Sequence, residues 1–295
     1  MSGNAPHLFL LPRRRPPRRP RLRGLSFNRM LPNLMTLTGL CVGFSSIRFA
    51  LDQRFGAAVI AIAVAGVIDG LDGRLARLLR ATSRFGAEFD SLSDFLCFGV
   101  APALVIYIWS LHVWGSIGYI PSLMFTACMA LRLARFNAAL DAEAHRDDRK
   151  YLPASRFASN FFTGVPAPAG AALALLPIYF GLEADQNGLM GLETLARAPI
   201  LSTVALIGTA LLCVSTLPVW TFKNFKVPPD YVLFILIGVI VVAAIIMADP
   251  WAGFVLLALA YLAMLPFSRR SFLRLQAEAE ARLEPEPEDN TNNQR

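Results

Sequence analysis

Residues 69–94 read DGLDGRLARLLRATSRFGAEFDSLSD. The stretch contains four aspartates, at successive spacings of three, eighteen and four residues: Asp69, Asp72, Asp90 and Asp94. It is flanked by long apolar segments. A carboxylate at membrane depth is energetically unfavourable, so an ionisable residue there marks a candidate functional site. Four of them on two adjoining helical segments predict a cage of carboxylates for divalent cations.

The composition places the chain in a membrane. Of 295 residues, 55% are hydrophobic and only 17% are charged, and the mean hydropathy is +0.49. These values exclude an ordinary soluble domain. Segments of about 20 apolar residues are long enough to span a bilayer as helices. The expected fold is an all-α polytopic membrane protein with about eight transmembrane helices, at about residues 31–51, 55–80, 86–110, 114–138, 162–182, 199–217, 230–248 and 251–267.

The positive charges indicate an orientation rather than a nucleic-acid partner. Much of the net charge of +7 lies in an arginine-rich run, Arg13 to Arg23, just before the first apolar segment. Such clusters favour the cytoplasmic side and contact anionic lipids. With the N-terminus inside, most other Lys and Arg residues also fall inside, and the aspartates lie at the cytoplasmic end of the membrane. The outer side then has little beyond Arg54 and Arg197.

Three regions are expected along the chain. Residues 1–27 form a basic cytoplasmic segment, and no small-residue cleavage site of a signal peptide follows it. Residues 28–267 form the membrane-embedded catalytic domain. Residues 268–295 form a cytoplasmic tail, whose acidic and proline-containing end is expected to be partly disordered.

Helical spacing brings the aspartates together. Residues three and four apart share a helix face, so one face of the second span carries Asp69, Asp72, Gly73, Ala76 and Arg77. Gly86, Asp90 and Asp94 share a face of the third span, and a short polar turn at 82–84 lets both faces meet. Hard carboxylate oxygens suit Mg²⁺ or Mn²⁺. Gly73 leaves room for a substrate, and Arg77 is placed to pair with a phosphate.

Two other interpretations of the aspartates stay open. In a salt-bridged helix hairpin, Arg74, Arg77, Arg80 and Arg84 would neutralise them. In a cation transporter they would line a translocation site near the bilayer midplane. The isolated histidines (His7, His112 and His145) and the four scattered cysteines form neither a metal-binding pattern nor a nucleophile pair.

The spacing from Asp69 to Asp94 resembles the signature of the CDP-alcohol phosphatidyltransferase family. All eight fixed positions are present, as Asp69-x2-Asp72-Gly73-x2-Ala76-Arg77-x8-Gly86-x3-Asp90-x3-Asp94. The resemblance implies an enzyme that joins a CDP-linked donor to an alcohol and releases CMP, with a six-helix membrane core and often a homodimeric state. It also implies a site with two metals held by the four aspartates, of which Asp69 bridges both and Asp94 is also the general base.

The resemblance assigns further residues to the donor. Gly73, Arg77 and Ser83 match positions that contact the CDP group. Pro32-Asn33-x2-Thr36 matches another donor-binding segment, which makes Asn33 and Thr36 candidates as well.

Three stretches outside the signature are similar to the phosphatidylserine synthase branch of the family. They begin at Leu31 (LPNLMT), at Phe98 (FGVAPA) and at Leu131 (LRLARFN), the last joined with FTGVPAP at 162–168. This resemblance implies CDP-diacylglycerol as donor, L-serine as acceptor, and a bacterial inner membrane as the location. The guanidinium fork suits a carboxylate, so Arg132 and Arg135, with Asn137, are candidates for binding serine. Glycerol 3-phosphate, an inositol compound or choline stays open as the acceptor.

Overall fold

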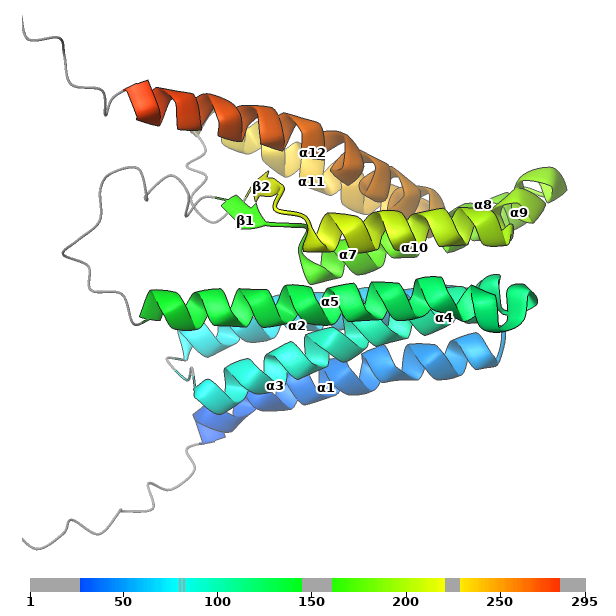
Figure 1. The fold of residues 1–295 in the computed structure, drawn as a ribbon, viewed down its shortest axis with the longest axis horizontal. Helices are drawn as coiled ribbons and strands as arrows, with labels where there is room; N and C mark the ends of the chain where they lie inside the picture. Colours follow the sequence, from blue (N-terminus) through cyan, green and yellow to red (C-terminus); the bar gives the residue numbers. More distant parts are fainter. Residues whose placement is uncertain (1–26, 80, 82, 145–160, 221–228, 282–295) are drawn as a thin grey trace, which may run out of the picture.

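The computed structural model describes residues 27–79, 81, 83–144, 161–220 and 229–281. Within these residues the fold is almost entirely helical (Figure 1). The elements are α1 (Phe27–Leu51), α2 (Phe55–Leu78), α3 (Arg84–Asp94), η1 (Phe95–Val100), α4 (Ala101–Trp109), η2 (Leu111–Trp114), α5 (Gly115–Ala144), β1 (Phe161–Thr163), α7 (Ala167–Ala174), α8 (Leu176–Gln186), α9 (Met190–Ala196), α10 (Pro199–Val214), β2 (Pro218–Trp220), α11 (Pro229–Ala248) and α12 (Pro250–Ala281).

The predicted polytopic all-α membrane fold is confirmed. In the described part of the chain, five helices are long and apolar enough to cross a membrane. The pairs α7–α8 and α9–α10, bent by 45° and 49°, raise this number to seven when each pair counts as one span. The apolar α11 is an additional helix of 20 residues. Each of the eight predicted segments therefore contains a helix, while the number of eight complete spans stays a prediction.

The fifth predicted segment differs in detail from the expectation. It was expected to be helical from residue 162, but residues Phe161–Thr163 form strand β1, and helix begins only at Ala167. The helix then bends at Leu175, just before Pro177 in the first turn of α8. Proline lacks the backbone N–H that would continue the helical ladder, which explains why one apolar segment becomes two helices.

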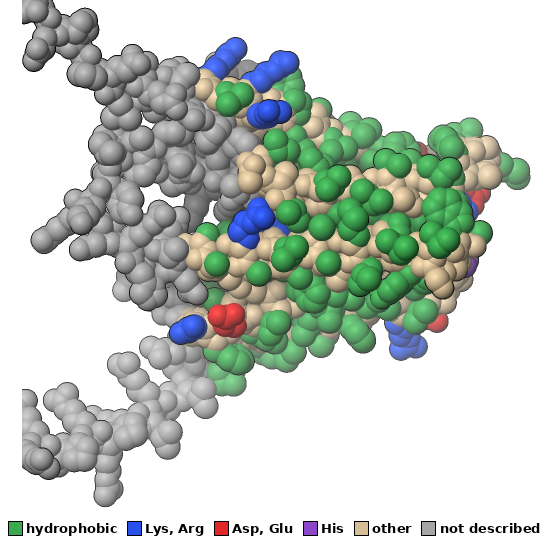
Figure 2. All heavy atoms as spheres, in the orientation of Figure 1, with side chains coloured by type: hydrophobic (Ala, Val, Ile, Leu, Met, Phe, Trp, Pro, Cys, Tyr) green, Lys and Arg blue, Asp and Glu red, His purple; other side chains and the backbone are tan. Residues whose placement is uncertain are grey.

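The outer surface of the helices is apolar (Figure 2). Large side chains point outward along several helices, including Leu78, Val204, Leu233 and Met247. A surface covered by apolar side chains is unfavourable in water and favourable against lipid tails. The exterior thus agrees with the apolar spans, and the chain is an integral membrane protein.

Both described ends of the chain lie at the same end of the helix bundle, together with the end of α5 (Figure 1). Exposed arginines gather toward this end (Figure 2), among them Arg269, Arg270 and Arg274 on α12. Helix α12 continues without a break across the predicted domain boundary at residue 267 as far as Ala281. The three-region division stays a prediction, because residues 1–26 and 282–295 lie outside the described residues.

Small residues let α1 pack closely against its neighbours. A Cβ atom on Gly39 would lie 3.2 Å from Cγ2 of Ile68 on α2, and one on Gly43 would lie 2.4 Å from Sγ of Cys97 on η1. The Cys97 thiol also donates a weak hydrogen bond to the Gly39 carbonyl, at 3.7 Å. Small residues drive helix association in membranes because they allow the backbones to approach. This contact fixes the helix of Asp94 against α1.

Gly43→Ala is therefore expected to lower the free energy of unfolding by about 1–3 kcal/mol, the usual effect of overpacking. The double variant Gly43→Ala/Cys97→Ala should recover part of the loss, because it removes the sulfur atom that the new methyl group meets. The check is unfolding in detergent micelles. Gly208→Ala on α10 is the matched control, since its Cβ would meet nothing within 4 Å. Equal destabilisation at both glycines would contradict the packing argument.

A π-helical segment follows the last aspartate directly. Helices α3, η1 and α4 run on without a break, and in η1 the N–H of Ala101 bonds to the carbonyl of Leu96, five residues earlier. Pro102 follows at once and has no N–H to donate. Single π turns inside α-helices are frequent at functional sites. Here the wider turn sets the rotation of the Asp90 and Asp94 face relative to α4.

Strands β1 and β2 form a short sheet next to the C-terminal end of α10. Phe161 pairs with Trp220 and Thr163 with Pro218, in antiparallel register. Gly164 follows β1 with a φ of +81°, and a Cβ there would lie 2.6 Å from the carbonyl oxygen of Cys213. An L side chain is strained at such a φ, so only glycine fits this turn. The turn places Val165 beside α5.

Candidate metal centre and active site

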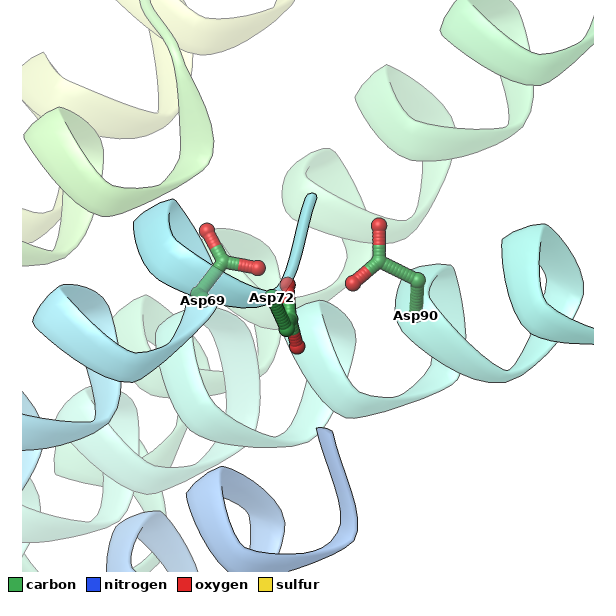
Figure 3. A group of neighbouring side chains, drawn as sticks. All are labelled: Asp69, Asp72 and Asp90. Atoms are coloured by element: carbon green, nitrogen blue, oxygen red, sulfur yellow. The ribbon is translucent and has the colours of Figure 1, made fainter. Parts of the chain in front are cut away.

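Three aspartates converge from two helices. Asp69 and Asp72 lie nearly one turn apart on α2, and Asp90 lies on α3. One carboxylate oxygen of each lies within 4.8 Å of the other two. Figure 3 shows the Asp90 carboxylate directed toward the two aspartates of α2. The prediction that the two helical segments bring their carboxylates together is confirmed for these three residues.

The fourth aspartate joins the group through Asp69. Asp94 lies one turn after Asp90, and its carboxyl group interacts with that of Asp69 at hydrogen-bonding distance. Asp94 also lines a small cavity with Asp69 and Asp72. The other residues of this cavity are Thr36, Gly39, Ala65, Ser93, Cys97 and Phe98. All four predicted aspartates therefore belong to one site, although Asp94 is not one of the three mutually close ligands.

No basic side chain forms an ion pair with the four aspartates within the described residues. The ion pairs found there are Arg48–Asp52, at 3.9 Å, and Arg197–Glu193, at 3.1 Å. Arg74, Arg77 and Arg84 pair with none of the four acids, so the described residues give no support to a salt-bridged hairpin. Arg80 lies outside them.

The chemistry of the site fits a bound cation. Asp72 is only 4% exposed, and the Oδ1 atom of Asp90 is buried and has no hydrogen-bond partner among the described residues. Burying unpaired charges or polar atoms is strongly unfavourable. Since several acidic oxygens face one another and form no ion pair in the described part of the chain, a divalent cation is the group that would satisfy them.

Thr36 positions one of the acidic ligands. Its hydroxyl donates to Oδ2 of Asp72 at 2.7 Å and also lies 3.1 Å from the carbonyl of Pro32. Sequence resemblance placed Thr36 in the donor-binding segment; the structure places it against a candidate metal ligand. Hydrogen bonds of this kind orient ligand carboxylates and tune metal affinity.

Thr36→Val is accordingly expected to weaken Mn²⁺ binding by about 10- to 100-fold, the usual effect of losing a partner of a metal ligand. The measurement is a Mn²⁺ titration of the purified protein followed by electron paramagnetic resonance. Thr38→Val is the matched control, because the Thr38 hydroxyl is exposed and bonds only to the carbonyl of Leu34. If both variants bind Mn²⁺ like the unmodified protein, Thr36 does not support the ligand.

Two other predicted donor residues meet at the start of α3. Ser83 caps the helix by accepting the N–H of Gly86 at 3.0 Å. A Cβ atom on Gly86 would lie 3.0 Å from Oδ1 of Asn33. Asn33 of α1 therefore lies directly against the first turn of α3. The glycine of the signature is explained by this close approach.

Gly73 and Arg77 face open space instead. A Cβ atom on Gly73 would meet nothing within 4 Å, and Arg77 is exposed. Internal packing does not require glycine at position 73. The backbone of Gly73 interacts with the Asp72 carboxylate, whereas Arg77 forms no ion pair with the aspartates in the described residues.

The three candidate serine-binding residues separate in the structure. Nε of Arg132 donates to the carbonyl of Val165 at 2.5 Å, and the guanidinium interacts electrostatically with Asp94. Arg135 is exposed and donates to the carbonyl of Val214 at 2.9 Å. Asn137 exchanges hydrogen bonds with Ser91, at 3.0 and 3.1 Å. Arg132 is thus directed toward the site, whereas Asn137 connects α5 to the helix that carries Asp90.

Sequence reasoning missed Ser91, Ser93 and Cys97. The Ser91 hydroxyl forms hydrogen bonds with the side chain of Asn137. Ser93 and Cys97 line the cavity beside Asp94. A local signal was present, because all three lie on or directly after the aspartate helix. Their partners come from α1 and α5, and no spacing within one helix indicates such contacts.

Comparison with known proteins agrees with this site. The family model described as CDP-alcohol phosphatidyltransferase matches residues 29–214, and one described as CDP-alcohol phosphatidyltransferase 2 matches residues 230–266. The first match contains α1 to α10 with all four aspartates, and the second covers most of α11 and the first half of α12.

Curated relatives cover most of the chain. A protein of Mycobacterium tuberculosis (strain ATCC 25618 / H37Rv) named CDP-diacylglycerol–serine O-phosphatidyltransferase is 37% identical over 246 residues, which are 82% of this chain and 79% of the relative. A protein of the same name from Helicobacter pylori (strain 26695) is 36% identical over 197 residues, 67% of this chain and 74% of the relative. The archaetidylserine synthase of Methanothermobacter thermautotrophicus is 33% identical over 146 residues, 48% of this chain and 54% of the relative.

Proposed function

The chain belongs to the CDP-alcohol phosphatidyltransferase family, and we propose that it transfers the phosphatidyl group of CDP-diacylglycerol to the hydroxyl of L-serine. The products are phosphatidylserine and CMP. The observation that carries the chemistry is the group of Asp69, Asp72 and Asp90, held within 4.8 Å inside a membrane protein without a basic partner in the described residues. The choice of serine is supported by the printed names of the relatives.

A divalent cation is the cofactor of this family, and the aspartates fit it. We assign Mg²⁺ or Mn²⁺ to a two-metal site that Asp69, Asp72, Asp90 and Asp94 would hold. Bound there, the metals supply electrostatic stabilisation for the negative charge on the transferred phosphoryl group and on the departing CMP. The protein itself contributes the fixed orientation of the carboxylates, through Thr36 at Asp72 and through Asp94 at Asp69.

Asp94 is proposed as the general base. It accepts the proton of the serine hydroxyl, and the oxygen attacks the phosphorus that bears diacylglycerol. One bond forms between serine oxygen and phosphorus, and the bond from that phosphorus to the bridging oxygen of CMP breaks. Direct transfer is favoured because the sequence offers no Ser/His or Cys/His nucleophile pair. Positioned proton transfer of this kind typically contributes 10²- to 10⁴-fold to the rate.

The donor is proposed to lie along the face opened by Gly73. Arg77 would pair with its phosphates, while Asn33, Thr36 and Ser83 would contact the CDP group. The absence of any packing neighbour for a Cβ at Gly73 supports close approach of a substrate to α2. The acyl chains stay in the bilayer beside the apolar helix surfaces.

The orientation follows from the arginines. Those at the end of α12 lie at the same end of the bundle as the beginning of α3 (Figure 1), and basic residues favour the cytoplasmic side. We therefore propose that the site opens to the cytoplasm, in a bacterial inner membrane. A homodimer is the proposed assembly.

The test is CMP release by purified protein in mixed micelles with CDP-diacylglycerol and Mn²⁺ or Mg²⁺. L-serine, glycerol 3-phosphate, inositol and choline are offered separately. CMP release with L-serine alone, with phosphatidylserine as lipid product, is the expected result. Release with another alcohol would keep the chemistry and replace the acceptor, and the lack of release with any alcohol would contradict the proposed transfer. A cation transporter, the alternative from another class, would release no CMP.

A further inference from the structure

A buried hydroxyl without a partner lies on the last described helix. Tyr261 of α12 packs against the hydrophobic core, and its hydroxyl oxygen is buried with no hydrogen-bond partner among the described residues. Leaving such a group unsatisfied costs about 1–3 kcal/mol. Phenylalanine would fill the same space without this penalty. The hydroxyl therefore calls for an explanation other than packing.

The surroundings of this hydroxyl connect it to the catalytic site. Tyr261 interacts electrostatically with Arg132 of α5 and with Cys213 of α10. Arg132 interacts in the same way with Asp94 on its other side. The guanidinium and Asp94 do not form a direct ion pair, because none within 4.0 Å joins them in the described part of the chain. Arg132 thus interacts with both the proposed base and the unsatisfied phenol.

Arg132 is held in this place by the backbone. Its Nε donates to the carbonyl of Val165, which the turn at Gly164 presents to α5. The fork of a guanidinium carries further N–H donors beyond Nε. An arginine that is fixed through Nε and interacts electrostatically with a phenol forms with it a donor set that suits a carboxylate.

We propose that Tyr261 and Arg132 together bind the carboxylate of the acceptor amino acid, and that Tyr261 is a specificity-determining residue for it. This inference rests on the proposed function, since it requires an acceptor with a carboxylate. With that group held between Arg132 and Tyr261, the hydroxyl of the acceptor is directed toward Asp94. Tyr261 lies in the segment 230–266 that matches a family model of its own.

The assignment also gives the last helix a role in the reaction. Helix α12 packs against α7, α8, α11 and β2. It also meets α2 at Gly56, where a Cβ atom would lie 3.1 Å from Trp251, about 20 Å along the helix from Asp69. Through Tyr261 it would contribute to the acceptor side of the site, while α1, α2 and α3 contribute the metal and donor side.

The test is Tyr261→Phe with two acceptors, L-serine and L-serinamide, which keeps the hydroxyl and the ammonium group but lacks the carboxylate. The KM for L-serine is expected to rise about tenfold, with the KM for CDP-diacylglycerol and the kcat changed less than twofold. The KM for L-serinamide should change less than twofold, because the phenol has no carboxylate to bind. The concentration of L-serine that gives half of its thermal stabilisation of the protein with Mn²⁺ should rise in parallel.

Thr203→Val is the matched control, because it also removes a buried hydroxyl that has no partner in the described part of the chain. Thr203 lies ten residues before Cys213 on α10, about 15 Å along the helix axis, and this variant should change neither KM. An unchanged KM for L-serine in Tyr261→Phe, or an equal rise for both acceptors, would overturn the inference. If the unmodified protein releases CMP only with an acceptor lacking a carboxylate, the proposed function fails first and the inference with it.

Discussion

Asp94→Asn is expected to lower the rate of CMP release with L-serine by about 10²- to 10⁴-fold, the range that a positioned general base contributes. Asparagine keeps the shape of the side chain but does not accept the proton of the serine hydroxyl. The rate should be measured at saturating CDP-diacylglycerol and L-serine over a series of Mn²⁺ concentrations. A loss that persists at the highest Mn²⁺ concentration separates the role of Asp94 as a base from its role as a metal ligand.

The same variant should fold at least as well as the unmodified protein. The carboxyl groups of Asp69 and Asp94 lie at hydrogen-bonding distance, and two like charges in one buried site repel each other. Replacing one with an amide is expected to raise the unfolding temperature of the metal-free protein. Asp185→Asn, at an exposed position of α8, is the control and should change neither property. Activity within tenfold of the unmodified protein would exclude Asp94 as the base.

Much of the fold could be predicted because its rules are local. About 20 apolar residues predict a spanning helix, and every predicted segment contains a helix. The features that were not predicted depend on contacts between distant residues or on single prolines. Strand β1 exists because it pairs with β2, more than fifty residues later. The bend before Pro177 and the π turn before Pro102 follow from a missing N–H, which an average over an apolar segment does not register.

The residues of the site likewise fall into those that local spacing predicts and those that only contacts between distant helices bring together. The gathering of Asp69, Asp72 and Asp90 was predictable, because spacings of three and four fix a helix face. The partners of these residues were not. Thr36 reaches Asp72 from α1, and only the packing of α1 on α2 brings them together. Tyr261 was harder still to predict, since it interacts electrostatically with Arg132 from the last described helix and no local motif marks it.

Asp69→Asn is expected to abolish metal-dependent activity together with the stabilisation of the protein by metal. A ligand that binds only the folded state at 100 times its Kd stabilises it by about 2.7 kcal/mol. In the unmodified protein, Mn²⁺ added after chelator treatment should therefore raise the unfolding temperature. In Asp69→Asn, the same rise should require at least tenfold more Mn²⁺ or be absent, and the titration followed by electron paramagnetic resonance should show the same shift.

Asp69 is expected to matter more than any other single aspartate because of its contacts. It belongs to the three-carboxylate group with Asp72 and Asp90, and its carboxyl group also interacts with that of Asp94. Asp90→Asn should weaken Mn²⁺ binding less, because it leaves the pair of Asp69 and Asp94 intact. Asp52→Asn, which removes an exposed carboxylate paired with Arg48, should leave the titration unchanged. If chelators do not affect activity, or if Asp69→Asn binds Mn²⁺ like the unmodified protein, the aspartates hold no catalytic metal, and their burial without a basic partner would need another explanation.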